Sequence, residues 1–222
     1  MLKRPTYTIH FTLLVVVLLV CFIINICLGS VTISFSDTVH ILFGTVSEDS
    51  SSSYIIWQYR LPKAITAILV GGGLSLSGLL MQTLFRNPLA GPYVLGISSG
   101  ASLGAAIIIM GSSLFSGYSV LATFNDISLA IASSIGSFLV LSLVLMVASK
   151  IKDTMALLII GLMFGSITAA VVSVLSYFSK AEKLQQYIFW SFGSLGNLSW
   201  LQILIVASCT VIGILLSIMT IK

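Results

Sequence analysis

Charged residues are scarce in this sequence. Asp, Glu, Lys and Arg make up 7% of its 222 residues, whereas soluble domains carry about 25%. Hydrophobic residues reach 58%, and the mean hydropathy is +1.15. A water-soluble fold of this size has too little polar side chain to cover so much apolar surface. The composition therefore excludes a soluble globular domain and predicts an integral membrane protein that resides in a lipid bilayer.

The chain also lacks a clustered basic face. Its formal net charge is only +4, and the ten Lys and Arg residues are spread along the sequence. Proteins that bind nucleic acid gather such residues into a patch or a stripe. We therefore expect no nucleic-acid partner.

Residues that bind metals or perform acid–base chemistry are few and isolated. The three cysteines lie far apart inside apolar runs, and the two histidines have no ligand-type spacing. Such a distribution provides neither a disulfide framework nor a zinc site. We expect no metal site and no cofactor bound by this chain.

Motifs for nucleotide hydrolysis and for nucleophilic catalysis are missing as well. The sequence contains no GxxxxGK[ST] phosphate loop and no GxSxG elbow. All six acidic residues lie at the ends of apolar runs or between them, whereas ion-coupled carriers usually keep an ionisable group inside a span. The chain is therefore predicted not to be an enzyme, and any transport must be energised by another component.

Long apolar runs predict about six membrane spans. Because about 20 apolar residues cross the hydrocarbon core, we expect helices over 9–29, 63–85, 93–110, 127–148, 154–178 and 201–221. The predicted fold class is all-α, a single polytopic transmembrane domain over 1–222. Lys3 and Arg4 precede the first run, which predicts a cytoplasmic N-terminus. This topology puts Arg60 and Lys63 on the outer surface, against the positive-inside tendency, which indicates a specific task for these two cations.

Two polar connections are predicted between the spans. Ser36 or Asp37 could cap a short helix over 38–43, because either side chain can accept from free backbone N–H groups. Residues 180–183 are a polar break, and Tyr187–Trp200 is an aromatic, glycine-containing connection to the last span.

Small residues mark the predicted contacts between helices. Gly96, Gly100 and Gly104 recur every four residues and form one smooth stripe for close packing. The Gly71–Gly73 triplet costs about 1 kcal/mol of helix propensity per residue relative to Ala. Tight packing is the simpler reading of these glycines, and a mobile helix that lines a pathway is the alternative.

The turn over 86–92 has a more specific pattern. Pro88 and Pro92 lack N–H donors and disfavour helical geometry at the residues that precede them. Irregular backbone at membrane depth is tolerated when it is buried in protein or faces a water-filled cavity. A simple surface turn and a gate in a transport pathway both remain open on this pattern.

The stretch RLPKAITAILVGGGLSLSGLLMQTLFRNPLAGPYVLGISSGASLGA closely resembles the FecCD-type permeases, which serve ABC importers of iron-siderophores, haem and cobalamin. The likeness continues through LLIIGLMFGSITAA and YIFWSFGSLGNLSW, and so covers most of 60–200. The resemblance implies the type II importer permease fold, which has roughly ten spans of about 20 residues each. We therefore expect the chain to be the N-terminal portion of such a permease, truncated after its sixth span.

The resemblance implies partners and a location. The chain would be the membrane subunit that moves a ferric siderophore, haem or cobalamin across the bacterial inner membrane. It would pair with a second permease subunit, as a homodimer, and with cytoplasmic ATPases that bind the ATP. An extracytoplasmic substrate-binding protein would deliver the ligand. A fragment that does not transport is one alternative, and an intramembrane enzyme is the other.

The resemblance also implies roles for individual residues. Arg60 and Lys63 correspond to an outward basic pair that docks the binding protein, although arginine is commoner where Lys63 stands. Asn87 and Leu89 correspond to the first cytoplasmic gate, and Thr154 and Met155 to the second. The residues expected to line the pathway or pack its helices are Gly71, Gly72, Gly73, Gly78, Gln82, Gly96, Gly100 and Gly104.

Overall fold

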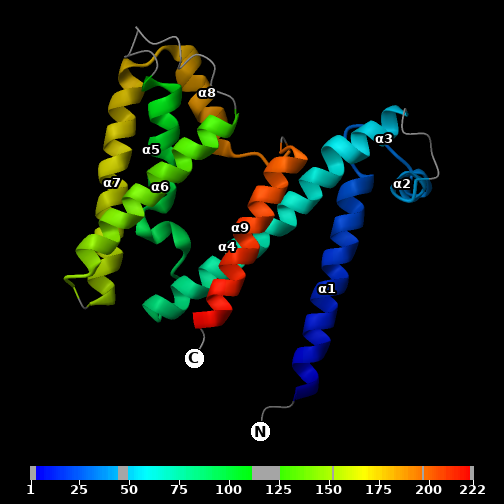
Figure 1. Cartoon of the computed structure of the whole chain (residues 1–222), viewed down its shortest axis with the longest axis horizontal. Coiled ribbons are helices and arrows are strands. Elements are labelled where there is room, and N and C mark those ends of the chain that lie inside the picture. Colours follow the sequence, from blue (N-terminus) through cyan, green and yellow to red (C-terminus); the bar gives the residue numbers. More distant parts are fainter. Residues whose placement is uncertain (1–3, 45–49, 112–125, 152, 197, 221–222) are drawn as a thin grey trace. The chain divides into compact units, whose positions relative to one another are not determined.

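The structure is a computed structural model, which describes residues 4–44, 50–111, 126–151, 153–196 and 198–220. Every regular element in these ranges is helical, which confirms the predicted fold class (Figure 1). The chain divides into two compact units. Unit 1 comprises Met1–Gly73 and Leu195–Lys222, and unit 2 comprises Leu74–Ser194.

Five helical stretches of the described chain are long and apolar enough to cross a membrane. They are Tyr7–Cys27, Ser51–Phe85, Ile127–Ala148, Met155–Phe178 and Trp200–Thr220. The third of the six predicted spans, 93–110, does not form a helix long enough to cross the membrane. Only Ile97–Ile109 is α-helical there, and its 13 residues rise about 20 Å, whereas the hydrocarbon core is about 30 Å thick. Proline and glycine shorten this helix, because Pro92–Leu95 forms a separate 3₁₀ turn that ends at the left-handed Gly96.

Unit 1 contains both ends of the described chain. Its elements are α1 (Arg4–Cys27), α2 (Phe35–Leu42), α3 (Ser51–Ile55), the π-helical turn η1 (Ile56–Arg60), the first half of α4 (Leu61–Phe85) and α9 (Trp200–Thr220). A small core of Ile26, Ile33, Ile41, Ile56 and Ala64 joins α1, α2 and the start of α4.

The short helix of unit 1 begins earlier than the sequence predicted. Ser34 is the N-cap of α2, and its Oγ accepts from the Asp37 N–H at 3.1 Å. Neither Ser36 nor Asp37 is the cap, because the extended backbone that a cap requires lies at Ser34. The helix therefore covers 35–42 rather than 38–43.

The π turn has a cause in the sequence. Pro62 has no N–H and its ring would clash with the carbonyl four residues earlier in a regular α-helix. The chain widens just before it, and the Leu61 N–H reaches back five residues to the Ile56 carbonyl. Elements α3, η1 and α4 thus form one uninterrupted helical stretch over Ser51–Phe85.

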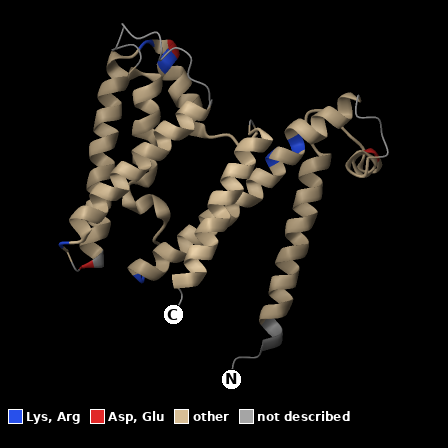
Figure 2. Ribbon diagram, viewed as in Figure 1, with Lys and Arg blue, Asp and Glu red and all other residues tan. Residues whose placement is uncertain are grey.

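Unit 2 is built around α5 (Ile97–Ile109). It packs against α6 (Asp126–Ala148), α7 (Thr154–Phe178) and α8 (Ala181–Phe192), with the 3₁₀ turn η2 (Pro92–Leu95) at its start. Helix α8 corrects the prediction that Tyr187–Trp200 is a connection, since the first part of that range is helical. In unit 2, Lys, Arg, Asp and Glu lie near the ends of the helices, and the ribbons between are uncharged (Figure 2).

Candidate docking, gate and packing sites

Arg60 is a buried arginine in unit 1, only 8% exposed. Its Nη1 donates to the Ile26 carbonyl at 2.9 Å and to the Cys27 carbonyl at 2.8 Å, and its Nη2 donates to the Val31 carbonyl. Carbonyls at the C-terminus of a helix lack partners within the helix and carry partial negative charge. The guanidinium therefore caps the end of α1.

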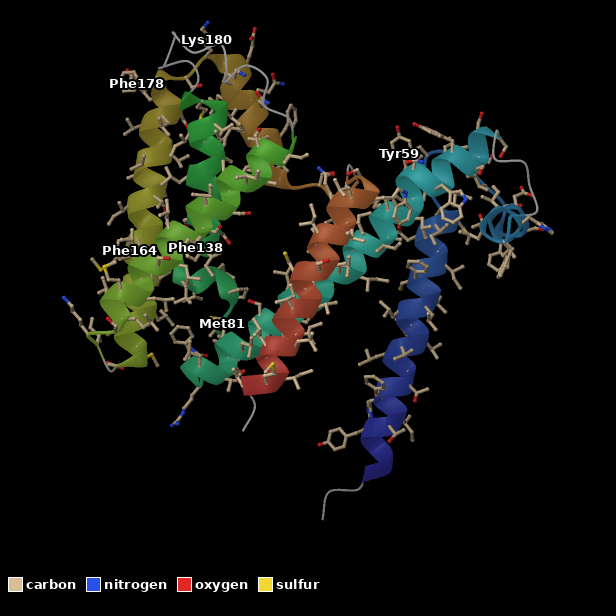
Figure 3. All side chains as sticks on the ribbon, viewed as in Figure 1. Tyr59, Met81, Phe138, Phe164, Phe178 and Lys180 are labelled. Carbon is tan, nitrogen blue, oxygen red and sulfur yellow. The ribbon has the colours of Figure 1, made fainter. Side chains whose placement is uncertain are left out.

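Lys63 lies three residues further along α4 and is exposed. The aromatic side chains of Trp57 and Tyr59 precede it, and they are 39% and 53% exposed (Tyr59 is labelled in Figure 3). The two cations of the predicted docking pair therefore differ in environment, one enclosed and one available to a partner.

The turn after α4 is a compact, self-bonded structure. The Arg86 N–H donates to the Thr83 carbonyl and the Asn87 N–H to the Gln82 carbonyl, at 3.4 and 3.2 Å. This pair of bonds is the Schellman arrangement that ends a helix, with the left-handed residue usually glycine. Here Arg86 occupies that position, with a φ of 48°.

Side chains fix the rest of this turn. The Asn87 Oδ1 accepts from the Leu89 N–H at 2.9 Å, and the Gln82 Nε2 donates to the Pro88 carbonyl at 3.0 Å. Leu89 projects from the turn with 82% of its surface exposed. The residues predicted as the first gate thus form an ordered turn with an apolar tip. The hydrogen bond from Gln82 helps to hold this turn in place.

The predicted second gate lies at the start of α7. Asp153 is the N-cap of this helix, and its Oδ1 accepts from the Met155 N–H at 2.9 Å. The helix begins at Thr154, and Met155 is 57% exposed.

One apolar cluster brings the two predicted gates to the same end of unit 2. Phe85 and Ala90 flank the first turn, and they pack with Val140 and Val144 near the end of α6. Side chains from the first turns of α7 pack against this cluster, as do Met81 and Phe164, which are labelled in Figure 3. Their role as gates stays a prediction.

The predicted glycine stripe is a site of tight helix packing. A Cβ added at Gly100 would lie 2.5 Å from the Gly136 carbonyl oxygen, and one at Gly104 would overlap the Ala132 carbonyl. At Gly96 the added atom would lie 3.1 Å from the Gly161 carbonyl oxygen, and the φ of 75° favours glycine as well. These glycines let α5 approach α6 and α7 closely.

The glycines of α4 have a different environment. A Cβ added at Gly71, Gly72 or Gly78 would meet no described atom within 4 Å, and one at Gly73 would meet only the Thr210 hydroxyl at 4.0 Å. Gly71 and Gly72 line an open apolar groove of about 390 Å³ between α1 and α4. Close packing therefore does not explain Gly71, Gly72 and Gly73 within unit 1, nor Gly78 within unit 2.

Sequence reasoning missed the contact between α5 and α8. The Tyr187 and Ser102 hydroxyls are hydrogen-bonded, and the Tyr187 ring stacks on Trp190 at 6.1 Å between centroids. The spacing of Leu184, Tyr187 and Trp190, which all pack against the buried end of α5, is a helical signal present in the sequence. Among the described residues, no group of three His, Cys, Asp or Glu is placed to bind a metal.

Comparisons with known proteins agree with the helical architecture. The chain is 34% identical to the hemin transport system permease protein HmuU of Yersinia pestis, over 92% of this chain and 58% of HmuU. It is 32% identical to the vitamin B12 import system permease protein BtuC of Klebsiella pneumoniae, over 86% of this chain and 52% of BtuC. The molybdate import system permease protein MolB of Haemophilus influenzae is also 32% identical, over 86% of this chain and 55% of MolB.

A solved structure of a metal-chelate type ABC transporter in an inward-facing conformation superposes with a TM-score of 0.74 at 29% identity. The alignment covers 96% of this chain and 62% of that one. The chain thus spans little more than half the length of the curated relatives it matches. Residues 17–222 match the model of the FecCD transport family. The chain therefore belongs to the FecCD transport family.

Proposed function

We propose that this chain is a transmembrane permease subunit of an ABC importer in the bacterial inner membrane, with its N-terminus in the cytoplasm. The observation that supports the proposal is that two ordered turns, at Asn87–Leu89 and at Asp153–Met155, lie beside one apolar cluster at one end of unit 2. Each presents an exposed apolar side chain. In a FecCD-family chain, such a pair is suited to open and close the inner end of a pathway.

The proposed cargo is a metal-containing compound. The named relatives carry vitamin B12, hemin and molybdate, so the family accommodates chemically different cargoes. We propose a ferric siderophore, haem or cobalamin for this chain, with molybdate as a further candidate raised by MolB. No cofactor is assigned to the chain itself.

The partners follow from the importer role. The chain would pair with a second permease subunit, as a homodimer, and with cytoplasmic ATPases that bind ATP. A substrate-binding protein would dock on the opposite face, where Arg60 and Lys63 are proposed to contribute. Crossing of the membrane is then driven by ATP hydrolysis in the separate subunits.

Uptake measurements test the proposal. A strain that lacks the gene is given the chain, and uptake of radiolabelled ferric siderophore, haem, cobalamin and molybdate is compared. Restored uptake of one cargo is expected, with loss of that uptake when Asn87→Ala removes the side-chain acceptor for the Leu89 N–H. Failure to restore any of the four, with the chain present in the membrane at its usual level, would contradict the proposal.

A further inference from the structure

Tyr93 is an exposed aromatic residue in the 3₁₀ turn η2, on the connection between α4 and α5. We propose that Tyr93 contacts the cargo and that its ring stacks on a flat, conjugated face of the transported compound. The cargo is then a metal complex with a planar ring system, as in haem, cobalamin or a catecholate siderophore, rather than a compact oxyanion such as molybdate. This inference rests on the proposed function and narrows its cargo.

The backbone on both sides of Tyr93 is fixed by unit 2. The Val94 N–H donates to the Gly91 carbonyl at 3.1 Å. The Gly96 N–H donates to the Tyr93 carbonyl at 3.0 Å. Val94 is buried, and a Cβ added at Gly161 of α7 would overlap its carbonyl, so the turn is wedged against α7. A ring on so firm a support loses little conformational freedom when a ligand binds to it.

The ring itself is placed by Gly91. A Cβ added at this glycine would overlap Cε1 of Tyr93 and would lie 3.0 Å from its Cδ1. The ring therefore lies directly against the glycine backbone, while 63% of Tyr93 stays exposed. Any larger residue at Gly91 must push the ring out of this position, even though Tyr93 itself is unchanged. Gly91 thus gives an independent way to move the ring.

The turn that carries Tyr93 lies at membrane depth. Its Val94 carbonyl meets Gly161, which is seven residues from the start of α7, a rise of about 10 Å. Since α7 rises about 37 Å and the hydrocarbon core is about 30 Å thick, a level this far from the helix end lies within the core. Leu89, the tip of the first predicted gate, is four residues earlier on the same connection.

Two features indicate that Tyr93 faces water rather than lipid. Its hydroxyl has no hydrogen-bond partner among the described residues, and a hydroxyl that faces hydrocarbon without a partner is costly. The backbone around it is irregular, and such backbone at membrane depth is tolerated where it is buried in protein or lines a water-filled cavity. Val94 and Leu95 are the buried side of this turn, which leaves Tyr93 for the cavity. In an importer, a water-filled cavity at this depth is the pathway.

An exposed aromatic ring on a firm support favours one class of cargo. Aromatic rings attract other conjugated or apolar faces, and every flat conjugated ligand offers such a face. A compact oxyanion offers none and is bound instead by N–H donors and cations. In the proposed homodimer, the second copy contributes a second Tyr93 ring to the same pathway.

Thiol labelling tests whether Tyr93 faces water. In a background in which Cys21, Cys27 and Cys209 are replaced by serine, Tyr93→Cys is treated with a charged maleimide in open membrane fragments. Phe138→Cys is the matched control, because Phe138 is 69% exposed on α6 and has no polar group (Figure 3). Tyr93→Cys should react about tenfold faster or more, since a thiol in apolar surroundings is rarely ionised. A rate no higher than that of Phe138→Cys would overturn the inference.

Uptake in the strain that lacks the gene tests the contact with cargo, with all variants present in the membrane at equal levels. Tyr93→Leu keeps apolar bulk but removes the conjugated face, so uptake should fall about three- to tenfold. Gly91→Ala, which displaces the ring without removing it, should give a similar loss. Tyr93→Phe should rescue uptake, which a general loss of folding would not allow. Tyr177→Ala, a control that is 83% exposed near the other end of α7, should leave uptake unchanged.

The outcomes separate this inference from the proposed function. Normal uptake in Tyr93→Leu, or an equal loss in Tyr93→Phe, would overturn the stacking role while the chain remains an importer. Restored uptake of molybdate alone by the unmodified chain would do the same. If the unmodified chain restores uptake of none of the four cargoes, the proposed function fails, and the labelling result still decides whether Tyr93 faces water.

Discussion

Arg86 shows how one residue keeps a strained conformation. Its φ of 48° places it in the left-handed region, where a residue with a side chain is disfavoured by about 1–2 kcal/mol. The Schellman bonds that surround it require this geometry to end α4. Strain of this kind persists when the surroundings determine it, and it is often found at functional positions.

Replacement of Arg86 by glycine should therefore stabilise the isolated chain. The strain is relieved, and the greater freedom of glycine in the unfolded chain offsets part of the gain, which leaves about 1 kcal/mol or less. For a chain of this size, a gain of about 1 kcal/mol corresponds to about 2–4 °C in Tm, so the rise should not exceed that range. Thermal unfolding in detergent measures it. Arg86→Ala is the control, because it removes the charge but keeps the β-carbon, and an equal rise in both variants would show that charge rather than strain is responsible.

Arg60 and Lys63 mark the limit of prediction for single residues. The sequence RLPK was enough to identify both residues as cations in an unexpected place. It was not enough to predict that Arg60 is buried and Lys63 is exposed. The direction of the Arg60 side chain depends on the π turn, which widens the helix before Pro62, and on the space at Gly29, 31 positions earlier in the chain. Neither is visible in local hydrophobic periodicity. The roles of the pair in docking remain predictions.

At the scale of elements, the glycines of α5 and of α9 should respond differently to the same change. A Cβ at Gly104 would overlap the Ala132 carbonyl, whereas one at Gly213 would meet no described atom within 4 Å. Gly104→Ala should destabilise the chain by about 1–3 kcal/mol, the usual cost of overpacking. Gly213→Ala should be neutral or stabilise by up to about 1 kcal/mol, because alanine is the better helix former. Unfolding monitored by circular dichroism compares the two variants, and a similar loss in both would contradict the packing role of Gly104.

Element boundaries could be predicted where apolar runs end in charged or turn residues. The predicted range 154–178 coincides with α7. The ranges 127–148 and 201–221 each begin one residue after the start of α6 and α9, and the described part of α9 ends at Thr220. Helix α8 was missed because its polar residues resemble a loop when the sequence is searched for membrane spans. Its side chains Leu184, Tyr187 and Trp190 pack on α5, whereas Ile188, Phe189 and Phe192 are exposed. Such a helix is stabilised by tertiary contact, which a span-length criterion does not detect.

At the scale of the whole molecule, the proposed importer requires two copies to meet at the gate. Leu89 is 82% exposed at the tip of a turn that its own hydrogen bonds hold, so any contact of its side chain would come from outside the turn. An exposed leucine at the inner end of a pathway is suited to contact its equivalent in a second copy. If the proposed homodimer forms, the Leu89 side chains of its two copies should therefore lie close together.

Leu89→Cys should form a disulfide between two copies and stop transport while it is closed. A disulfide requires β-carbons about 3.5–4.5 Å apart, so it reports close approach of the two turns. The experiment uses a background in which Cys21, Cys27 and Cys209 are replaced by serine, and non-reducing electrophoresis is combined with cargo uptake. Tyr177→Cys is the matched control: it is 83% exposed but lies 22 residues along α7 from Met155, a rise of about 33 Å. Cross-linking at Leu89 with undiminished uptake would rule out the gate, since a closed pathway cannot pass a bulky metal complex, and equal cross-linking at Tyr177 would show only random collision in the membrane.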